Sequence, residues 1–304
     1  MNILITGSTG LVGSDILKIL LLDEKLSIVA LSRNKQSFAH SKLTWIYSDF
    51  SNSKFDFKEL LRGIDVVVHI AADIGKYNLD HNFINSININ INFTSELFLN
   101  CKSSSVKKII YISTYNFLRK PLDKVITESH DIAPLSSYAI GKYWGEMLLF
   151  SYLAEKNIEV VSLRITSPIS CNFNHLHNSI VKIWISRALK RKAIVVFGKG
   201  NRIQDYIATD DIARAIILSI QNNVSGIYNL ASAAPISNLK LAEIIASWGG
   251  VEIEFSGVDA LEHVRWNISL DKAKEDLNFM PEYTSRQAIE RLINSNITTD
   301  KTLY

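Results

Sequence analysis

The sequence predicts an α/β protein with a doubly wound parallel sheet and a smaller C-terminal lobe. Short apolar runs rich in β-branched residues alternate with helical stretches through the first half of the chain, and three evenly spaced glycines follow the first run. Continuous apolar runs are typical of strands that helices cover on both sheet faces. Because strand–helix alternation at this spacing implies right-handed crossovers, the strands are expected to be parallel.

The first half of the chain supplies most of the expected sheet. A strand over 2–6 leads into a helix over 10–21, which gives the first strand–helix unit. Further strands are expected over 26–32, 43–48, 65–72, 107–113 and 159–165, and helices over 57–63, 82–103 and 136–156.

The second half is less regular and yields more helices than strands. Val181, Trp184 and Ile185 share one helical face, so an amphipathic helix is expected over 181–191. Thr209 is expected to cap a helix over 209–220. The remaining elements are strands over 193–198 and 226–232 and helices over 238–248, 270–277 and 285–294.

Composition and charge describe an ordinary globular chain of 304 residues, 47% of them hydrophobic. Lys and Arg number 33 against 30 Asp and Glu, a balance too even to indicate nucleic-acid binding. Cys101 and Cys171 form neither a disulfide framework nor a metal pattern, and His175 and His177 lack a third ligand, so no metal is expected. No secretory signal precedes the first strand and no apolar run reaches membrane-spanning length, so the sequence predicts a cytoplasmic protein away from membranes.

The glycine-rich segment "TGSTGLVG", residues 6–13, follows a strand and opens a helix, which is the setting of a dinucleotide fingerprint. Gly7 permits the tight turn, Gly10 lets a pyrophosphate touch the backbone, and Gly13 lets helix and strand pack closely. The phosphates then meet the positive end of the helix. The sequence therefore predicts a Rossmann-type sheet with Thr9, Leu11 and Val12 completing the phosphate loop.

The end of the second strand indicates which nicotinamide cofactor binds. An acidic residue there favours NAD because it accepts hydrogen bonds from both ribose hydroxyls. This chain has Ser32 and Arg33 instead, and a guanidinium suits a 2′-phosphate. We therefore expect NADP, with NAD as the alternative if Arg33 is only a solvated surface residue.

Tyr138 and Lys142 lie four residues apart on an expected helix and so share one face. An ammonium near a phenol stabilises the phenolate and lowers its pKa, and a tyrosine tuned in this way exchanges a proton with an alcohol or carbonyl near neutral pH. Ser113 and Thr114 end a strand at the sheet edge where ligands bind, and a hydroxyl there can hold the substrate oxygen. The predicted catalytic residues are Tyr138, Lys142 and Thr114.

With these motifs in place, nearly the whole chain resembles extended short-chain dehydrogenase/reductases of the NAD-dependent epimerase/dehydratase type. The resemblance implies that Lys142 also bonds the nicotinamide ribose and that Ser113 and Tyr138 border the cofactor. It adds further cofactor residues: Asp49 and Phe50 near the adenine, Ala71 and Ala72 in the turn after His69, Asn90, and Thr166 and Pro168 beside the nicotinamide. It also implies a homodimer, since two helices pair between subunits in this family.

The substrate that the resemblance implies is a nucleotide-diphosphate sugar. Residues 160–204 contain no Asp or Glu, and their basic side chains attract phosphate. Thr114 and Tyr138 would meet the sugar. Many relatives carry a phosphate-binding arginine where this chain has Gln204, and of their second basic element only Arg265 stands in the matching region. We take Gln204 and Arg265 as the remaining substrate candidates.

Several activities fit these residues. A nucleotide-sugar 4-ketoreductase is the first expectation, because Ser32 and Arg33 indicate an exchangeable NADPH. A 4-epimerase, which keeps its cofactor, is the alternative, and a non-catalytic NADP sensor is a third. A 4,6-dehydratase is disfavoured because Tyr115 follows Thr114 where dehydratases of this family carry an Asp-Glu pair. We expect an NAD(P)-binding domain over 1–165 with 203–232 and a substrate-binding lobe over 166–202 with 233–304.

Overall fold

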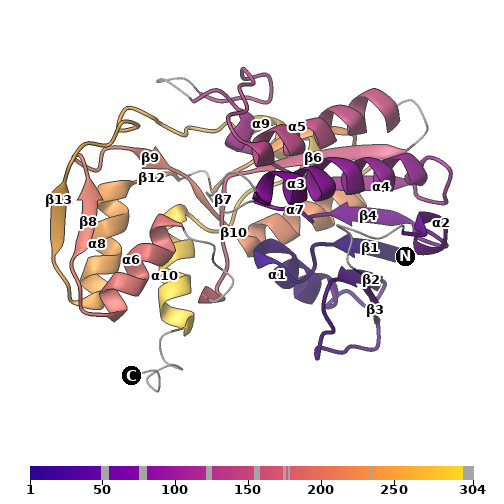
Figure 1. The fold of residues 1–304 in the computed structure, drawn as a ribbon, viewed down its shortest axis with the longest axis horizontal. Coiled ribbons are helices and arrows are strands. Elements are labelled where there is room, and N and C mark those ends of the chain that lie inside the picture. The colour runs from indigo at the N-terminus through magenta and orange to yellow at the C-terminus, as the bar shows by residue number, and fades with distance from the viewer. Residues whose placement is uncertain are drawn as a thin grey trace.

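The chain forms two unequal parts in a computed structural model, with a large sheet on the right of Figure 1 and a smaller lobe on the left. The structure describes residues 1–48, 55–74, 81–120, 125–153, 158–173, 176, 179–232 and 234–296. Within these ranges no helix is both long and apolar enough to cross a bilayer.

Seven parallel strands make the large sheet, in the order β11-β6-β5-β4-β1-β2-β3. Their bounds are β1 Asn2–Thr6, β2 Ser27–Ser32, β3 Leu43–Tyr47, β4 Val66–His69, β5 Lys108–Thr114, β6 Glu159–Ile165 and β11 Gly226–Leu230. The chain moves outward in one direction from β1 to β3 and in the other from β4 onward. That reversal between β1 and β4 creates the crevice where open α/β sheets bind ligands, and the doubly wound fold is confirmed.

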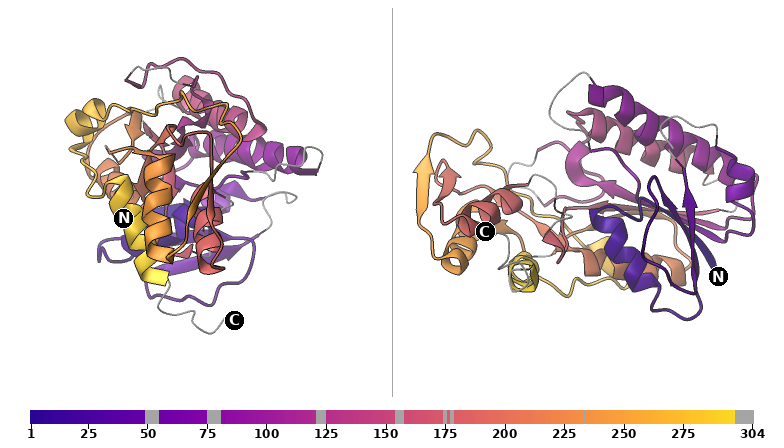
Figure 2. Two further views of the ribbon diagram at one scale, coloured as in Figure 1. Left: turned by 90° about the vertical axis from the view of Figure 1, so that its left-hand side faces the viewer. Right: turned by 60° about the horizontal axis from the view of Figure 1, so that its bottom comes forward.

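Helices cover both faces of this sheet, as Figures 1 and 2 show. Alternate strand residues point to opposite faces, so Ile3 and Ile5 of β1 join one core cluster while Leu4 joins another. The first cluster is completed by α1 (Leu11–Leu20), α7 (Thr209–Gln221) and α9 (Asp271–Leu277), and the second by α2 (Phe57–Leu60) and α4 (Thr94–Cys101). Because helices bury the side chains on both faces of the sheet, the inner strands are continuous apolar runs in the sequence.

Two of the predicted helices contain a wide π turn that the sequence did not reveal. The helix expected over 82–103 consists of α3 (His81–Ile87), the π turn η1 (Asn88–Phe93) and α4. The helix expected from 136 consists of α5 (Ser137–Leu148) and the π turn η3 (Leu149–Leu153). Ser136 begins α5 as a cap, since its hydroxyl accepts a hydrogen bond from the Ala139 amide at 3.1 Å.

The smaller lobe has its own apolar core between three helices and a two-stranded parallel sheet. The helices are α6 (Ile180–Leu189), α8 (Asn238–Gly249) and α10 (Ser285–Asn296), and the strands are β8 (Ile194–Phe197) and β13 (Ile253–Ser256). Four very short strands join the lobe to the large sheet: β7 Ser167–Ile169, β9 Ile203–Gln204, β10 Tyr206–Ala208 and β12 Ile236–Ser237. Segments of two or three residues have no readable period, which is why the sequence did not predict them.

The predicted division into two domains stays a prediction, and one helix sits differently from it. Helix α9 lies within the range assigned to the lobe, yet Ala273, Leu277 and Phe279 pack into the core of the large sheet. The turn that ends α9 changes the chain direction, because Asn278 adopts a left-handed conformation there, and the chain then continues to α10.

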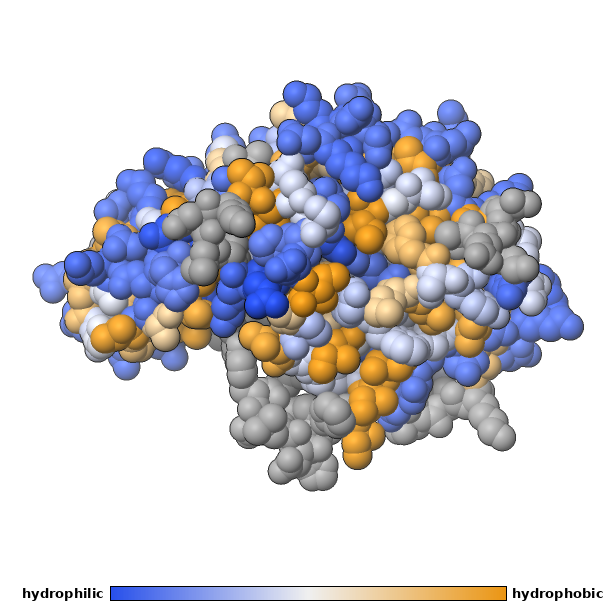
Figure 3. Space-filling model, turned by 90° about the horizontal axis from the view of Figure 1, so that it is seen from above, coloured by the Kyte–Doolittle hydropathy of each residue, from blue (hydrophilic) through white to orange (hydrophobic). Residues whose placement is uncertain are grey.

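Seen from above, the face over α3, α4 and α5 mixes apolar and hydrophilic side chains (Figure 3). The exposed apolar residues of these helices include Ile84, Ile140 and Met147, each with about half or more of its surface open. The predicted homodimer stays a prediction.

Candidate active site

A cavity of about 660 Å³ lies at the carboxyl ends of the sheet strands and extends to the lobe. We call its two parts the sheet end, lined by the glycine loop, Thr114, Tyr138 and Lys142, and the lobe end, lined by Ser179, Arg202, Gln204 and Tyr206. The structure brings these sequence-predicted residues together in the lining: Gly7, Thr9, Gly10, Leu11, Val12, Gly13, Ser32, Arg33, Ala71, Ala72, Ser113, Thr114, Tyr138, Lys142, Thr166, Pro168 and Gln204.

Two predicted residues, Asn90 and Arg265, are described but do not line the cavity. Asp49 and Phe50 lie outside the described residues. Asn90 is buried behind the cavity, where its side chain accepts a hydrogen bond from the Asp73 amide and donates to the Asp73 carbonyl, both at 2.8 Å. Arg265 does not line the cavity either, because its guanidinium donates to the Glu262 and Val264 carbonyls at 2.6 and 3.1 Å.

The glycine loop is shaped to admit a pyrophosphate. Gly7 has φ of +71°, and a Cβ there would stand 2.6 Å from the Ala71 amide nitrogen. A Cβ on Gly13 would overlap the Gly7 carbonyl oxygen at 2.1 Å, so helix α1 approaches the loop as closely as it does only because Gly13 has no side chain. No side chain caps the start of α1 in the described chain, which leaves its first amides facing the cavity. These residues fit the diphosphate of a dinucleotide.

Ser32 and Arg33 lie where the adenosine ribose is expected but differ in what they offer. The Ser32 hydroxyl donates to the Asn34 carbonyl at 2.7 Å and accepts from the Gln36 amide at 3.1 Å, so its hydrogen is already used. The Arg33 side chain is exposed and joins no ion pair among the described residues. A 2′-phosphate would therefore meet Arg33 alone.

His69 belongs to a buried hydrogen-bonded chain under the loop. The Thr6 hydroxyl accepts from the Ile70 and Ala71 amides, both at 3.2 Å, so it donates its own hydrogen to His69 Nδ1 at 2.6 Å. His69 Nε2 then donates to the Thr94 hydroxyl at 2.9 Å, which fixes a neutral ring. Burial, with help from nearby Lys142, keeps the pKa of His69 well below its usual value. His69 supports the turn that carries Ala71 and Ala72.

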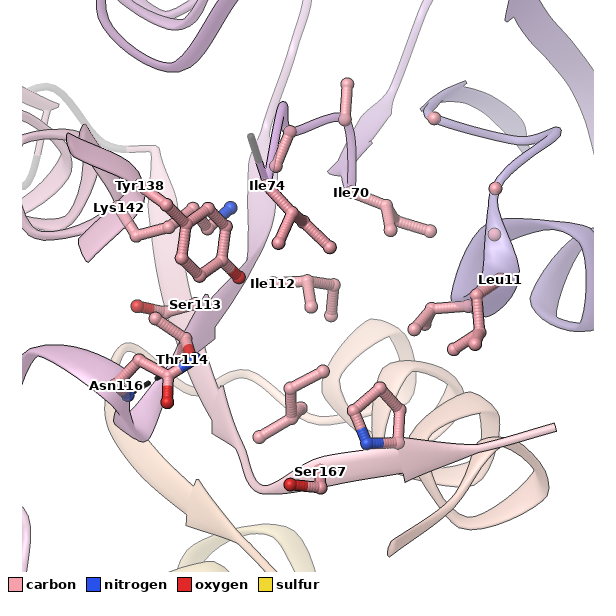
Figure 4. Close-up of a pocket in the computed structure, with 18 of the residues that line it drawn as sticks. Leu11, Ile70, Ile74, Ile112, Ser113, Thr114, Asn116, Tyr138, Lys142 and Ser167 are labelled. Atoms are coloured by element: carbon pink, nitrogen blue, oxygen red, sulfur yellow. Dashed lines mark hydrogen bonds between the residues drawn. The ribbon is translucent and has the colours of Figure 1, made fainter. Parts of the chain in front are cut away.

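Helix α5 presents Tyr138 and Lys142 to the sheet end of the cavity, and Figure 4 shows the Tyr138 hydroxyl facing the open space. Burial raises the pKa of Tyr138 to about 12, although a hydrogen bond with Thr114 opposes the shift. Burial also lowers the pKa of Lys142 to about 7, against the attraction of the Glu146 carboxylate. The expectation that Lys142 lowers the Tyr138 pKa is therefore wrong for the chain alone. The physical reason is that both groups lose water, and the Lys142 ammonium stands 4.0 Å above the Tyr111 ring.

A buried ion pair ties α5 to the sheet one turn beyond Lys142. The Glu146 carboxylate accepts from the Arg164 guanidinium at 2.5 to 3.2 Å and from the Ser162 hydroxyl at 2.7 Å. Both charged side chains are at most 3% exposed. Arg164 is the register partner of Ser113, so the pair fixes the helix bearing Tyr138 against the strands bearing the cavity hydroxyls.

The end of β5 and the residues after it place Ser113, Thr114 and Asn116 at the cavity (Figure 4), and Tyr115 also lines it. The Thr114 hydroxyl accepts from the Asn116 amide at 3.2 Å. The Ser113 hydroxyl is buried and has no hydrogen-bond partner within the described chain. The Tyr115 hydroxyl is 3.0 Å from that of Ser167, and the Tyr115 ring packs edge-on against Trp266. Tyr115 and Asn116 thus occupy the positions after Thr114 with neutral groups.

Sequence reasoning did not assign several lining residues to the site. The apolar wall comes from Leu31, Ile70, Ile74, Ile89, Ile112, Ile165, Ile169, Leu176 and Ile180, and the additional polar groups are Tyr115, Asn116, Ser167, Ser179, Arg202 and Tyr206. The apolar residues look like any core residue in a sequence. Arg202 could have been found, because it stands two residues before Gln204, a spacing that places side chains on one side of an extended segment.

Residues 3–231 match the NAD dependent epimerase/dehydratase family. The chain belongs to this family. The assignment confirms the short-chain dehydrogenase/reductase resemblance and makes the protein an NAD-dependent enzyme of that group.

Proteins similar to this chain match it over nearly its full length. A putative UDP-glucose 4-epimerase of Methanocaldococcus jannaschii is 27% identical over 96% of this chain and 97% of its own. The UDP-glucuronic acid 4-epimerase of Bacillus cereus, solved with UDP-glucuronic acid and NAD, superposes with a TM-score of 0.85 at 23% identity, covering 97% of this chain and 98% of that one. DesIV, a dTDP-glucose 4,6-dehydratase of Streptomyces venezuelae, reaches 0.84 at 19% identity, covering 97% and 96%. At these identities the two structures show the shared fold.

Proposed function

We propose that the protein is an NAD-dependent 4-epimerase of a uridine-diphosphate sugar. The observation that carries the proposal is the sheet end of the cavity, where Thr114, Tyr138 and Lys142 meet a glycine loop shaped for a pyrophosphate. The similar 4-epimerases named above support this choice over the 4-ketoreductase expected from Ser32 and Arg33, so the alternative becomes the main proposal.

The chain's own residues handle the proton. When bound, NAD supplies a nicotinamide that accepts hydride from sugar carbon 4 and later returns it to the opposite face. The ionised form of Tyr138 takes the proton from the 4-hydroxyl in the first step, and the resulting phenol gives it back in the second, so the reaction is a net isomerisation. Thr114 holds the sugar oxygen beside Tyr138, with which it already shares a hydrogen bond. Lys142 lines the same end of the cavity, where it would hold the nicotinamide ribose.

Neutral side chains after Thr114 argue against an elimination reaction. A 4,6-dehydratase must remove a proton from carbon 5 and protonate the departing hydroxyl on carbon 6, which requires a further acid and base. Tyr115 and Asn116 line the cavity at the positions where such groups are expected, and the Tyr115 hydroxyl already pairs with Ser167. Burial raises the pKa of Tyr115, so it stays neutral.

NAD is the cofactor of this proposal, and NADP is a secondary ligand. The family and the NAD-bound structure support NAD. The exposed Arg33 guanidinium and the lack of an acidic residue between Ser32 and Lys35 leave room for a 2′-phosphate. Because the Ser32 hydroxyl already donates to the Asn34 carbonyl, the extra phosphate of NADP gains little more than its contact with Arg33.

The test is to incubate the purified protein with NAD and UDP-glucose, UDP-glucuronic acid or UDP-N-acetylglucosamine, and to resolve the 4-epimers by NMR. The expected result is conversion of at least one sugar to a mixture of two epimers without accumulation of reduced nicotinamide. Consumption of NADPH with a 4-keto sugar, and no epimer from any of the three, would instead support the ketoreductase.

A further inference from the structure

Two buried side-chain atoms in the described chain have no hydrogen-bond partner, and both belong to cavity residues: Ser113 Oγ and Arg202 Nε. A buried donor without a partner costs free energy, so folded proteins retain few of them. Ser113 lies at the sheet end and Arg202 at the lobe end. The two positions mark where the protein leaves hydrogen bonds to be completed by a ligand.

Arg202 joins no ion pair among the described residues, and at the lobe end of the cavity it is the lining arginine. Arg164 is neutralised by Glu146, and Arg265 is held by loop carbonyls. The nearest buried carboxylate in the sequence, Asp205, is directed elsewhere, since it accepts from the hydroxyls of Thr166 and Ser232, each at 2.6 Å. No ion pair involves Arg202 in the part of the chain that the structure describes.

The neighbouring polar residue of β9 cannot take the place of this cation. The Gln204 amide nitrogen donates to the Asn238 side-chain oxygen at 2.8 Å and to the Tyr206 hydroxyl at 3.2 Å, so its donors are occupied. The backbone around Arg202 is anchored on both sides, because its carbonyl accepts from the Asn238 amide at 2.9 Å and Ile203 pairs with the Val264 carbonyl. Arg202 thus places a positive group without an ion pair at the lobe end, on an anchored backbone and in a segment without acidic residues from 160 to 204.

We propose that Arg202 binds an oxyanion of the substrate and sets the preference of the lobe end for anionic sugars or phosphates. The inference deepens the proposed function and depends on it. Phosphate and carboxylate oxygens are the partners that a guanidinium fork recognises through paired charge-assisted hydrogen bonds. In a UDP-sugar the oxyanion is either a diphosphate oxygen, common to all such substrates, or the carboxylate of a uronic acid.

The test compares the binding of UDP, UDP-glucose and UDP-glucuronic acid by calorimetry to the unaltered chain and to Arg202→Gln, with NAD present. Loss of a charge-assisted hydrogen bond predicts about 10- to 100-fold weaker binding. An equal loss for all three ligands assigns Arg202 to the diphosphate, and a loss confined to UDP-glucuronic acid assigns it to the sugar carboxylate. Arg202→Lys, which keeps the charge without the fork, should fall between.

Lys199→Gln is the matched control, because it removes the same charge from an exposed residue of the same segment that does not line the cavity. Its affinities should stay within about twofold of the unaltered chain. NAD affinity measured alone should not change in any of these variants, which shows that each is folded. Unchanged UDP-sugar binding by Arg202→Gln, or an equal loss in Lys199→Gln, would overturn the assignment while leaving the epimerase proposal standing. Failure of the unaltered chain to bind any of the three ligands would overturn both.

Discussion

At the sheet end of the cavity, β5 and β6 pair over seven residues and a buried ion pair locks α5 beside them. At the lobe end, β9 pairs with β12 over only two residues, and side-chain hydrogen bonds such as Gln204 to Asn238 hold the lining. The sheet end therefore has its proposed catalytic groups fixed by regular structure. The lobe end depends on a few side-chain contacts and keeps Arg202 unpaired, so it can change its ligand preference without disturbing the fold.

The largest effect is expected for Tyr138→Phe, which removes the proton carrier but keeps the ring. Epimerisation should fall about 10²- to 10⁴-fold. Thermal stability at pH 7 should hardly change, because the Tyr138 hydroxyl is neutral there with a pKa of about 12. Steady-state kinetics and thermal melting of the same preparations check both parts. An active variant would show that the sheet end does not supply the proton.

Glu146→Gln tests whether the sheet end is locked by charge. Arg164 would keep its buried charge without a carboxylate, and breaking such a pair costs about 3–5 kcal/mol. Chemical unfolding should show this loss, whereas replacing both residues by methionine should recover much of it. A variant as stable as the unaltered chain would contradict the locking role, and the comparison between the two ends would weaken.

Lys142→Met separates stability from function at the sheet end. Burial lowers the Lys142 pKa from its ordinary 10.5 to about 7, so keeping this ammonium in the folded chain opposes folding. The opposition is full below about pH 7, shrinks as pH rises from 7 to 10.5, and disappears above 10.5, where both folded and unfolded chains carry neutral lysine. Lys142→Met should therefore gain about 2–4 kcal/mol at pH 7 and almost nothing at pH 10.5, while losing activity.

Unfolding curves at the two pH values check the sign. The control is Lys102→Met at the residue that follows α4, whose ammonium lies over the ring of Tyr152 at the protein surface. It should change the stability by less than about 0.5 kcal/mol at either pH. A Lys142→Met gain that grows with pH would contradict burial as the cause of the shift.

The smallest effect concerns the ribose edge of the sheet. Arg33→Asp should weaken NADP binding about tenfold or more, since one charge-assisted contact is replaced by repulsion, and should leave NAD within a few-fold of its original affinity. Quenching of protein fluorescence by each dinucleotide measures the two affinities. Equal effects on NAD and NADP would show that Arg33 does not distinguish the ribose groups.

The comparison also explains what the sequence could reveal. The strands of the large sheet and the residues at their ends, such as Gly7 and Thr114, were predictable because long apolar runs fix the strand positions. Tyr138 was predictable from its four-residue spacing to Lys142 on a helix. Gly141 and Gly145 were not, although α5 packs closely only because they lack a Cβ, which would lie 2.5 Å from Asn90 and Tyr111 atoms. The lobe end was predicted least well, because two-residue strands carry no pattern and Arg265 turns toward its own loop.

The sequence also misled us about the effect of Lys142 on the Tyr138 pKa, which we expected to be lowered and which is raised. Spacing on a helix places the two side chains on one face, and the structure agrees. Spacing does not report the water that each group loses, and that loss decides both pKa values here. Burial therefore had to come from the three-dimensional structure.

The most direct test of the account follows the hydrogen on sugar carbon 4. A UDP-sugar carrying deuterium at that carbon is incubated with the protein and NAD in ordinary water, and the product epimer is examined by NMR. If hydride leaves and returns within one closed site while Tyr138 handles only the hydroxyl proton, the epimer keeps its deuterium at carbon 4. An epimer in which that deuterium has been replaced by solvent hydrogen would contradict the proposed reaction.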